Sequence, residues 1–294
     1  MKQVLEVMEP PTIVFYRFLM ASIGLGAILA VKKRLPPLRV FRKPRWLILL
    51  AVATAGLFGN FILFSSSLQY LSPTASQVIG QLSPVGMMVA SVFILKEKMR
   101  STQVVGALML LSGLVMFFNT SLVEIFTKLT DYTWGVIFGV GAATVWVSYG
   151  VAQKVLLRRL ASPQILFYCT LYVIALFPLA KHGVIAQQPL AARMFNFCGL
   201  NTLVGYGALA EAMARWQAAQ VSAIITLTPL FTLFFSDLLS LAWPDFFARP
   251  MLNLLGYLGA FVVVAGAMYS AIGHRIWGGL RKHTTVVSQP RAGE

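Results

Sequence analysis

The sequence predicts an all-α membrane protein, an inverted repeat of two five-helix units of which nine helices are present. Three observations predict it: an apolar composition, a series of long apolar segments, and an internal repeat. The chain has 294 residues, of which 58% are hydrophobic and only 11% are Asp, Glu, Lys or Arg. Its mean hydropathy is +0.76. A soluble domain of this size needs more charge on its surface, so the bilayer is the expected solvent.

Each apolar segment is long enough for a tilted membrane helix, because a span needs about 20 residues. Backbone groups in lipid must be hydrogen-bonded within the protein, and the sequence lacks the alternating strands of a membrane β-barrel, so helices are favoured. The nine predicted spans are Pro11–Val31, Trp46–Tyr70, Ser72–Leu95, Thr102–Asn119, Tyr132–Val155, Pro163–Leu179, Met194–Ala214, Ala218–Leu241 and Leu252–Ala271.

The distribution of basic residues predicts the orientation. If the loop Val31–Arg45 lies in the cytoplasm and the spans alternate from there, most of the 24 Lys and Arg residues fall on the cytoplasmic side. This bias agrees with the positive-inside rule, and it places the C-terminus inside and Met1 outside. A net charge of +15 in a soluble protein would suggest nucleic acid as a partner. Here the charge lies between apolar segments, so no nucleic-acid partner is expected.

Two halves of the chain resemble each other. The run PTIVFY that begins at Pro11 matches the run PQILFY that begins at Pro163, and the triplet LSP at Leu82 matches LTP at Leu227. Gly106 in the fourth predicted span pairs with Gly256 in the ninth. The span Tyr132–Val155 has no counterpart in the first half, so we expect the first helix of a five-plus-five protein to lie upstream of Met1. Internal repeats of this kind determine the fold class.

Because five is an odd number, two such units in tandem insert with opposite orientation. That is the inverted-repeat plan of many secondary transporters, in which the substrate path lies near the pseudo-two-fold axis. The predicted division is a first repeat over 1–125, a second repeat over 126–271 and a basic cytoplasmic tail over 272–294. Function follows as transport of a small solute across a membrane by alternating access.

The chain resembles the EamA family of the drug/metabolite transporter superfamily. The resemblance rests on the run FYRF at Phe15, the Pro84 helix followed by LKEK, the helix with Gly106 and Gly113, Trp146, and the triplet LTP at Leu227. It implies a ten-helix carrier of the bacterial inner membrane that exports amino acids or related metabolites. Two departures stand out: the first helix is missing, and AWPD follows the second-half proline helix where the family has an acidic residue.

Three charged residues fall within the predicted spans. Arg17 is costly near the bilayer interior, so it either binds an anionic group or serves a structural role at helix ends or the interface. Glu211 lies one helical turn from Arg215, and it is either a substrate or proton site or a paired group at the cytoplasmic end. Asp237 is either a proton-coupling group, if burial raises its pKa, or an exposed acid.

Polar and aromatic residues suggest the solute pathway. Pro84 and Pro229 occupy equivalent positions, which we place in the middle of their helices, and each is either a hinge or a packing kink. The remaining pathway candidates are polar or aromatic side chains that either line the path or join helices by hydrogen bonds: Asn60, Gln77, Gln81, Trp146, Tyr149, Tyr206, Ser222 and Thr226. Gly135 and Gly139 are expected to allow close helix packing.

The sequence contains no metal-binding pattern, phosphate loop or nucleophile elbow, so no cofactor or metal is expected and the chain is not predicted to be an enzyme. Two alternatives stay open: an enzyme acting on lipid within the membrane, and a scaffold or partner subunit that does not itself transport. The expected partners are a small solute, the bilayer, and a proton or another coupling ion. Substrate, direction, coupling ion and oligomeric state are not given by the sequence.

Overall fold

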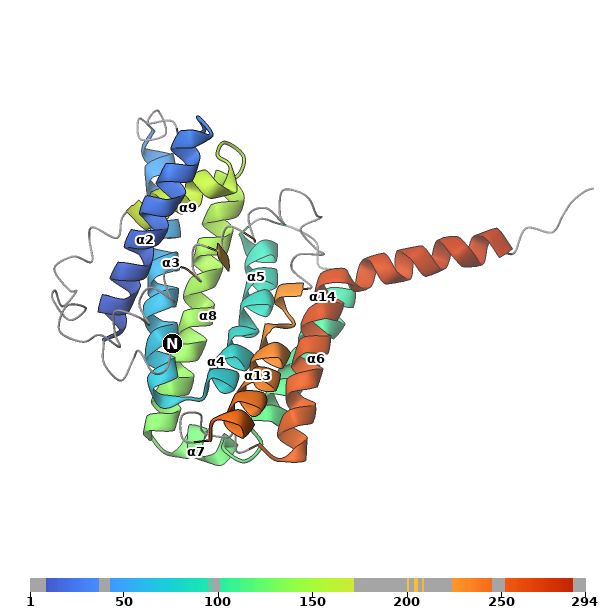
Figure 1. The fold of residues 1–294 in the computed structure, drawn as a ribbon. Coiled ribbons are helices and arrows are strands. Elements are labelled where there is room, and N and C mark those ends of the chain that lie inside the picture. The colour runs from blue at the N-terminus through green and yellow to red at the C-terminus, as the bar shows by residue number, and fades with distance from the viewer. Residues whose placement is uncertain are drawn as a thin grey trace, which may run out of the picture.

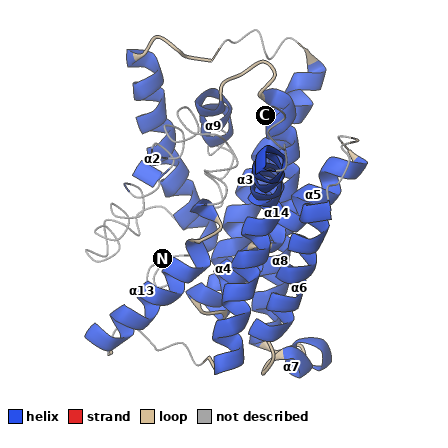
Figure 2. Ribbon diagram, turned by 90° about the vertical axis from the view of Figure 1, so that its right-hand side faces the viewer, coloured by secondary structure: helices blue, strands red, loops and turns tan. Residues whose placement is uncertain are grey.

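The computed structural model describes residues 9–36, 43–94, 96, 101–171, 200, 204–205, 208, 224–244 and 252–287. Over these residues all of the regular secondary structure is helical, as predicted (Figures 1 and 2). Four helices are long and apolar enough to cross a membrane: Pro10–Val31, Pro44–Tyr70, Asp131–Leu156 and the first part of the last helix, Leu254–Ile272. The first three are α2, α3 and α8, and the fourth belongs to α14 (Leu254–Val287). The predicted membrane-protein fold class is confirmed.

Shorter helices complete the described part of the bundle. They are α4 (Pro73–Gly80), α5 (Leu82–Phe93), α6 (Ser101–Phe117), α7 (Leu122–Thr127), α9 (Ser162–Leu171) and α13 (Thr228–Ala242). The predicted span Met194–Ala214 lies almost wholly outside the described residues, and α9 and α13 are the described parts of two further predicted spans. The short helix α7 was not predicted.

Local sequence explains where several helices begin. α2, α3 and α4 each begin at a proline, which is favourable in a first turn because those amide groups have no helical acceptor. Ser72 accepts a hydrogen bond from the Ala75 amide at 3.2 Å and caps α4. Thr130 accepts one from the Thr133 amide at 3.4 Å and caps α8. Such caps satisfy amide groups that the helix itself leaves unbonded.

Two antiparallel helix pairs form the frame. In the first, α3 packs against α8: Gly56 lies beside Tyr149, and Tyr70 lies beside Gly135 at the other end. In the second, α6 packs against α14 with glycines on both sides of the contact (Figure 1). The predicted role of Gly135 and Gly139 in close packing is confirmed. A Cβ atom at Gly135 would lie 2.6 Å from Leu71 Cγ, and one at Gly139 would lie 3.0 Å from Ile79 Cγ2.

The α6–α14 pair is symmetric between the two repeats. Gly106 meets the Gly266 carbonyl, and Gly113 meets the Gly259 carbonyl. A two-fold rotation that exchanges α6 and α14 converts one contact into the other. Gly106 is then equivalent to Gly259, and Gly113 is equivalent to Gly266, with the same sequence spacing in each pair. The alignment of Gly106 with Gly256 was therefore wrong in its register. The two-fold relation between antiparallel helices is the inverted-repeat geometry that the sequence predicts.

The two basic loops predicted to be cytoplasmic lie at the same end of the bundle. Gln164 Nε2 at the start of α9 donates a hydrogen bond to the Arg34 carbonyl, at 3.0 Å. This bond joins the loop after α2 to the loop between α8 and α9, whose ends carry Lys32, Lys33, Arg158 and Arg159. The structure thus agrees with the prediction that these two basic loops lie on the same side of the membrane.

Two segments depart from their predicted bounds. The predicted span Ser72–Leu95 is not one helix, because α4 ends at Gly80 and α5 begins at Leu82. The predicted tail 272–294 is helical as far as Val287, and this last part of α14 points away from the bundle (Figure 1). The end of the apolar segment does not by itself end the helix, although residues 273–287 include three glycines and two threonines, which are weak helix formers.

Candidate functional site

Two helices are interrupted at equivalent positions of the repeat. In the first half, the turn at Gln81 separates α4 from α5. In the second, a turn at Thr226 and Leu227 separates the helical residues 224–225 from α13. The LSP and LTP triplets align these two turns residue for residue, and α13 packs against α4 (Figure 2). The helices next to the two breaks, α4 in the first half and α13 in the second, therefore pack against each other.

The prolines follow these breaks and do not lie in the middle of a helix, which corrects their predicted placement. Pro229 is in the first turn of α13, and Pro84 is the third residue of α5. A proline in a first turn removes an amide that would have no helical acceptor, so it causes little loss there. It also prevents the preceding segment from continuing as a regular α-helix. In place of a hinge or kink at Pro84 and Pro229, each helix is interrupted by a turn two to three residues before the proline.

Gln81 has the least satisfied side chain near these breaks. It is 8% exposed, and its Oε1 atom is buried without a hydrogen-bond partner. Leaving a buried acceptor unbonded costs about 1–3 kcal/mol, so such an atom calls for an explanation. Thr226, at the equivalent position, is also buried, at 5% exposed. Gln77, one turn before Gln81 on α4, is half-buried.

Other buried polar residues, which the sequence analysis did not single out, lie on α4 and on the part of α3 that it contacts. Ser76 and Ser67, both fully buried, are joined by a hydrogen bond of 3.2 Å between α4 and α3. Thr74 is fully buried and its Oγ1 has no partner. The sequence could have indicated these residues through the several Ser and Thr hydroxyls in the apolar segment around Ser72. Such residues also occur wherever membrane helices touch, so the pattern is not specific.

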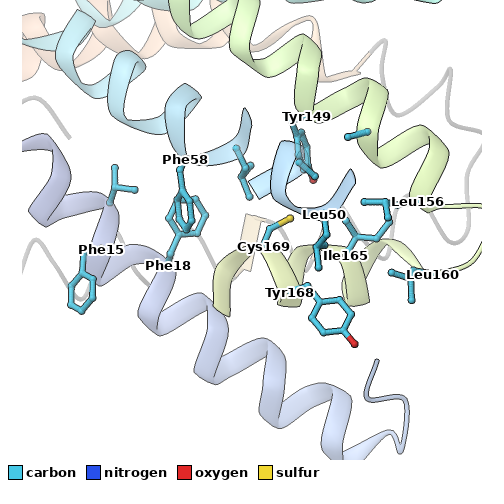
Figure 3. Close-up of a cluster of buried hydrophobic side chains, with 14 residues drawn as sticks. Phe15, Phe18, Leu50, Phe58, Tyr149, Leu156, Leu160, Ile165, Tyr168 and Cys169 are labelled. Carbon is cyan, nitrogen blue, oxygen red and sulfur yellow. The ribbon is translucent and has the colours of Figure 1, made fainter. Parts of the chain in front are cut away.

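Arg17 belongs to a second group of candidates, between α2 and α3. Its guanidinium carbon lies 5.2 Å from the centre of the Phe61 ring, a cation–π contact. Phe18 makes edge contacts with Phe61 and Phe58, at 4.8 and 5.1 Å between ring centres. Figure 3 shows Phe18 and Phe58 next to each other within the buried cluster that joins α2, α3, α8 and α9. The arginine thus sits at the edge of an aromatic layer.

Asn60, Trp146 and Tyr149 lie along the α3–α8 contact. Asn60 Nδ2 donates a hydrogen bond to the Ala142 carbonyl at 2.9 Å, so its amide joins the two helices, which is the second of the two predicted alternatives. The Trp146 and Tyr149 rings lie 4.9 Å apart at their centres. Tyr149 is buried in the cluster of Figure 3, and Trp146 packs against it. Tyr149 therefore belongs to the same buried cluster as Phe18 and Phe58, and Trp146 lies at its edge.

Asp237, predicted to be either a proton-coupling group or an exposed acid, accepts a hydrogen bond from a tyrosine. Its two carboxylate oxygens lie 3.1 and 3.4 Å from the Tyr257 hydroxyl, which donates the bond from α14. Close by in sequence, Asn253 and Asn119 exchange amide hydrogen bonds of 2.9 and 3.1 Å between α14 and the end of α6. Asn253 also accepts from the Gly256 amide at 2.8 Å and so caps α14. Sequence inspection missed Tyr257 because an isolated tyrosine in an apolar span has no distinctive pattern.

Three predicted candidates, Tyr206, Glu211 and Ser222, lie outside the described residues, as does Arg215. Within the described ranges, no three His, Cys, Asp or Glu residues are grouped so that they could hold a metal ion. What the structure does bring together is a seam of neutral polar groups around the helix breaks and an aromatic layer with Arg17 nearby. Such a seam can hydrogen-bond and desolvate a small solute.

The comparisons with known proteins agree with this architecture. The EamA-like transporter family matches residues 1–119 and 133–268. The chain is 95% identical over 296 aligned residues to a protein of Escherichia coli K12 named uncharacterized inner membrane transporter YhbE, across 100% of this chain and 92% of that protein. It is 48% identical to an uncharacterized transporter of Haemophilus influenzae, across 94% and 90%. A solved crystal structure with 19% identity superposes with a TM-score of 0.63 over 94% of this chain and 91% of that one, which shows the fold alone.

Proposed function

The chain belongs to the EamA-like transporter family, and from that premise we propose that it is a secondary carrier of the bacterial inner membrane that exports amino acids or related metabolites. Its two repeats, 1–125 and 126–271, alternately expose one central site to each side. In this proposal the C-terminus is cytoplasmic, together with the basic loops after α2 and α8. The relatives named as transporters support the function, and the E. coli relative named as an inner membrane protein supports the location.

One observation carries the proposal: one helix in each repeat is interrupted at an equivalent position, and the helices next to these breaks, α4 and α13, pack against each other. In carriers with inverted repeats, the substrate site is formed by broken helices near the bilayer midplane, since their free backbone groups can bind solute or ions. The break at Gln81 and the break at Thr226 supply this arrangement. The polar seam around them provides the candidate pathway, with Gln77, Gln81 and Thr226 as its described members.

Arg17 and Asp237 have separate roles in the proposal. Arg17, held against Phe61, is placed to attract an anionic group such as a carboxylate at the edge of the aromatic layer. Asp237 bonds Tyr257 across the α13–α14 contact, so a proton taken up by the carboxylate would change how α13 is held. Proton coupling through Asp237 is the version of the mechanism that we would test first.

The proposal is tested by flux. The chain, and in parallel its 95% identical relative, of which it covers 92%, are reconstituted in proteoliposomes with pooled radiolabelled amino acids and metabolites. Efflux or uptake is measured with a proton gradient, with a sodium gradient and with neither. We expect flux of at least one solute class above empty liposomes. If neither protein moves any solute under any gradient, the carrier proposal fails.

Variants at the breaks relate the flux to these interruptions. Pro84→Ala and Pro229→Ala restore an amide that can continue the helix, so each should lower flux while the protein remains folded. The matched control is Pro73→Ala, because Pro73 is the first residue of α4 and lies outside the break. Equal flux in all three variants would remove the breaks from the mechanism.

A further inference from the structure

The two helix breaks are equivalent in position but different in chemistry. Pro229 has no amide hydrogen for the Ile225 carbonyl, and that carbonyl instead accepts a hydrogen bond from Thr228 Oγ1. Pro84 likewise has none for the Gly80 carbonyl. The residue equivalent to Thr228 is Ser83, and within the described first half no hydrogen bond joins Ser83 to Gly80. Both carbonyls therefore lack their helical donor. In the second break Thr228 replaces that donor, whereas in the first break Ser83 does not.

A second acceptor lies next to it in sequence. Gln81 Oε1 is buried and without a partner, and the side chain is more than nine-tenths buried. The other partnerless buried oxygens among the described side chains are hydroxyls of Ser and Thr, which can also donate to a carbonyl of the preceding helical turn. An amide oxygen accepts only. The group that satisfies Gln81 Oε1 must therefore bring its own donor or a positive charge.

The local field and the space favour the same kind of group. Gly80 is the last residue of α4, so its carbonyl lies at the negative end of that helix dipole, which attracts cations. A Cβ atom placed on Gly80 would meet no atom within 4 Å, whereas the glycines of the α6–α14 contact would meet backbone atoms below 3 Å. The break thus has two acceptors, a negative helix end and open space on one side.

We propose that the α4 break is a subsite for a compact cation, held by Gln81 Oε1 and the Gly80 carbonyl. This inference rests on the proposed carrier function, and it names the chemistry that one part of the transport site selects. Two sources share that chemistry: the ammonium group of an amino-acid or amine solute, and a free alkali cation. The subsite is one-sided, because Thr228 neutralises the equivalent carbonyl in the second repeat.

Burial of Gln81 Oε1 ties the subsite to a conformational change. The oxygen is covered in this conformation, so a cation reaches it only when the elements packed around α4, among them α13 and α8, separate. A ligand that satisfies the oxygen in the separated arrangement, and cannot do so in the packed one, shifts the population toward opening. Cation binding and exposure of the site are then one event.

Binding is measured without flux, on the purified full chain in lipid nanodiscs at constant ionic strength. Methylammonium chloride is the ammonium probe and sodium chloride the alkali probe, each titrated against N-methyl-D-glucamine chloride, with N-methyl-D-glucamine acetate as an anion arm. The readout is the saturable shift of thermal unfolding. The variants are Gln81→Leu, which removes the acceptor, and Gln81→Glu, which strengthens it. Gln153→Leu is the matched control, because Gln153 is far from the break. Gly139 of α8 lies against Ile79 of α4, and Gln153 lies about 20 Å farther along α8, at about 1.5 Å per residue.

We expect a saturable shift with methylammonium, with sodium or with both, and the probe that gives it identifies the source. Gln81→Leu should raise the half-saturating concentration about tenfold or more, as expected for loss of a hydrogen bond to a charged group. Gln81→Glu should lower it, and Gln153→Leu should leave it unchanged. If Gln81→Leu does not fold, the Gln81→Glu arm decides.

Three results would overturn the subsite: no cation-specific shift in the unaltered protein, equal shifts in Gln81→Leu and Gln153→Leu, or a Gln81-dependent shift with acetate. These outcomes are separate from the flux test of the carrier proposal. Flux with no cation binding would refute the subsite and leave the carrier standing. Cation binding without flux of any solute would refute the carrier and leave the binding site standing.

Discussion

The glycine contact between α6 and α14 allows one stability prediction to be worked out in detail. In Gly266→Ala, the added Cβ would lie 2.6 Å from the Leu110 amide nitrogen and 2.7 Å from the Gly106 carbonyl oxygen. Both are backbone atoms, which cannot rotate away as a side chain can. Comfortable contact needs about 3.5–4.0 Å, so the two helices must move apart by about 1 Å along much of their length.

The free-energy cost of the steric conflict is measured against a control variant, at a glycine where an added Cβ has enough space. In Gly141→Ala, the nearest atom to the new Cβ is Leu63 Cδ1 at 3.5 Å, an ordinary contact with a flexible side chain. Both variants gain the same helix propensity, about 1 kcal/mol, so their difference reports the steric conflict. Overpacking of this kind costs about 1–3 kcal/mol. Gly266→Ala should therefore unfold with a free energy about 1–3 kcal/mol below that of Gly141→Ala.

The assay is reversible unfolding by SDS in mixed micelles, followed by circular dichroism. Gly113→Ala is an internal check, because the pseudo-two-fold pairs Gly113 with Gly266, and its Cβ would likewise lie 2.6 Å from a backbone nitrogen, that of Val263. The two should be destabilised alike. If Gly266→Ala is as stable as Gly141→Ala, then the close α6–α14 contact does not exist in the membrane and the reasoning is refuted.

Two further predictions concern hydrogen bonds of α14, and a third concerns the side of the membrane on which the basic loops lie. Asp237→Ala, which removes the acceptor, and Tyr257→Phe, which removes the donor, should show a coupling energy of about 1 kcal/mol in a double-mutant cycle of unfolding; additive effects would contradict that bond. Asn253→Ala should lower stability by about 1 kcal/mol through loss of the α14 cap, and Asn253→Ser, which keeps a capping oxygen, should recover part of it. No recovery would show that the cap is not the cause. Single cysteines introduced at Lys33 and Arg158 should react with a membrane-impermeant maleimide from the same side, the cytoplasm, in inverted vesicles and not in intact cells. Labelling from opposite sides would break the inverted-repeat geometry.

Long apolar helices were the part of the fold that sequence reasoning predicted best. The predicted span Tyr132–Val155 is α8, Asp131–Leu156, because a sustained apolar run between a threonine cap and a basic loop has few alternatives in lipid. The resemblance to the EamA family is confirmed by the match over both halves. The interruption at Gln81 was placed wrongly, since a proline shows that a helix is disturbed but not how far before it the helix ends.

The candidate site was predicted less well, for a different physical reason. A glutamine or asparagine in an apolar span either lines a cavity or joins two helices, and the sequence pattern is the same in both cases. Asn60 turned out to donate to the Ala142 carbonyl, whereas Gln81 was left with an unbonded acceptor. Only the packing of neighbouring helices distinguishes the two, because it decides which polar atoms find partners.

The sequence by itself determined the solvent, the helical class and the duplication, because each depends on composition and order along the chain. Apolar length fixes the spans, and an odd number of helices per repeat fixes their opposite orientation. Tertiary structure alone decided which glycines meet across α6 and α14, that α13 packs against α4, and that Thr228 bonds the Ile225 carbonyl at one break while, among the described residues, Ser83 does not bond the Gly80 carbonyl at the other. These are contacts between segments far apart in the chain, and their register depends on side-chain packing, which one-dimensional periodicity does not encode.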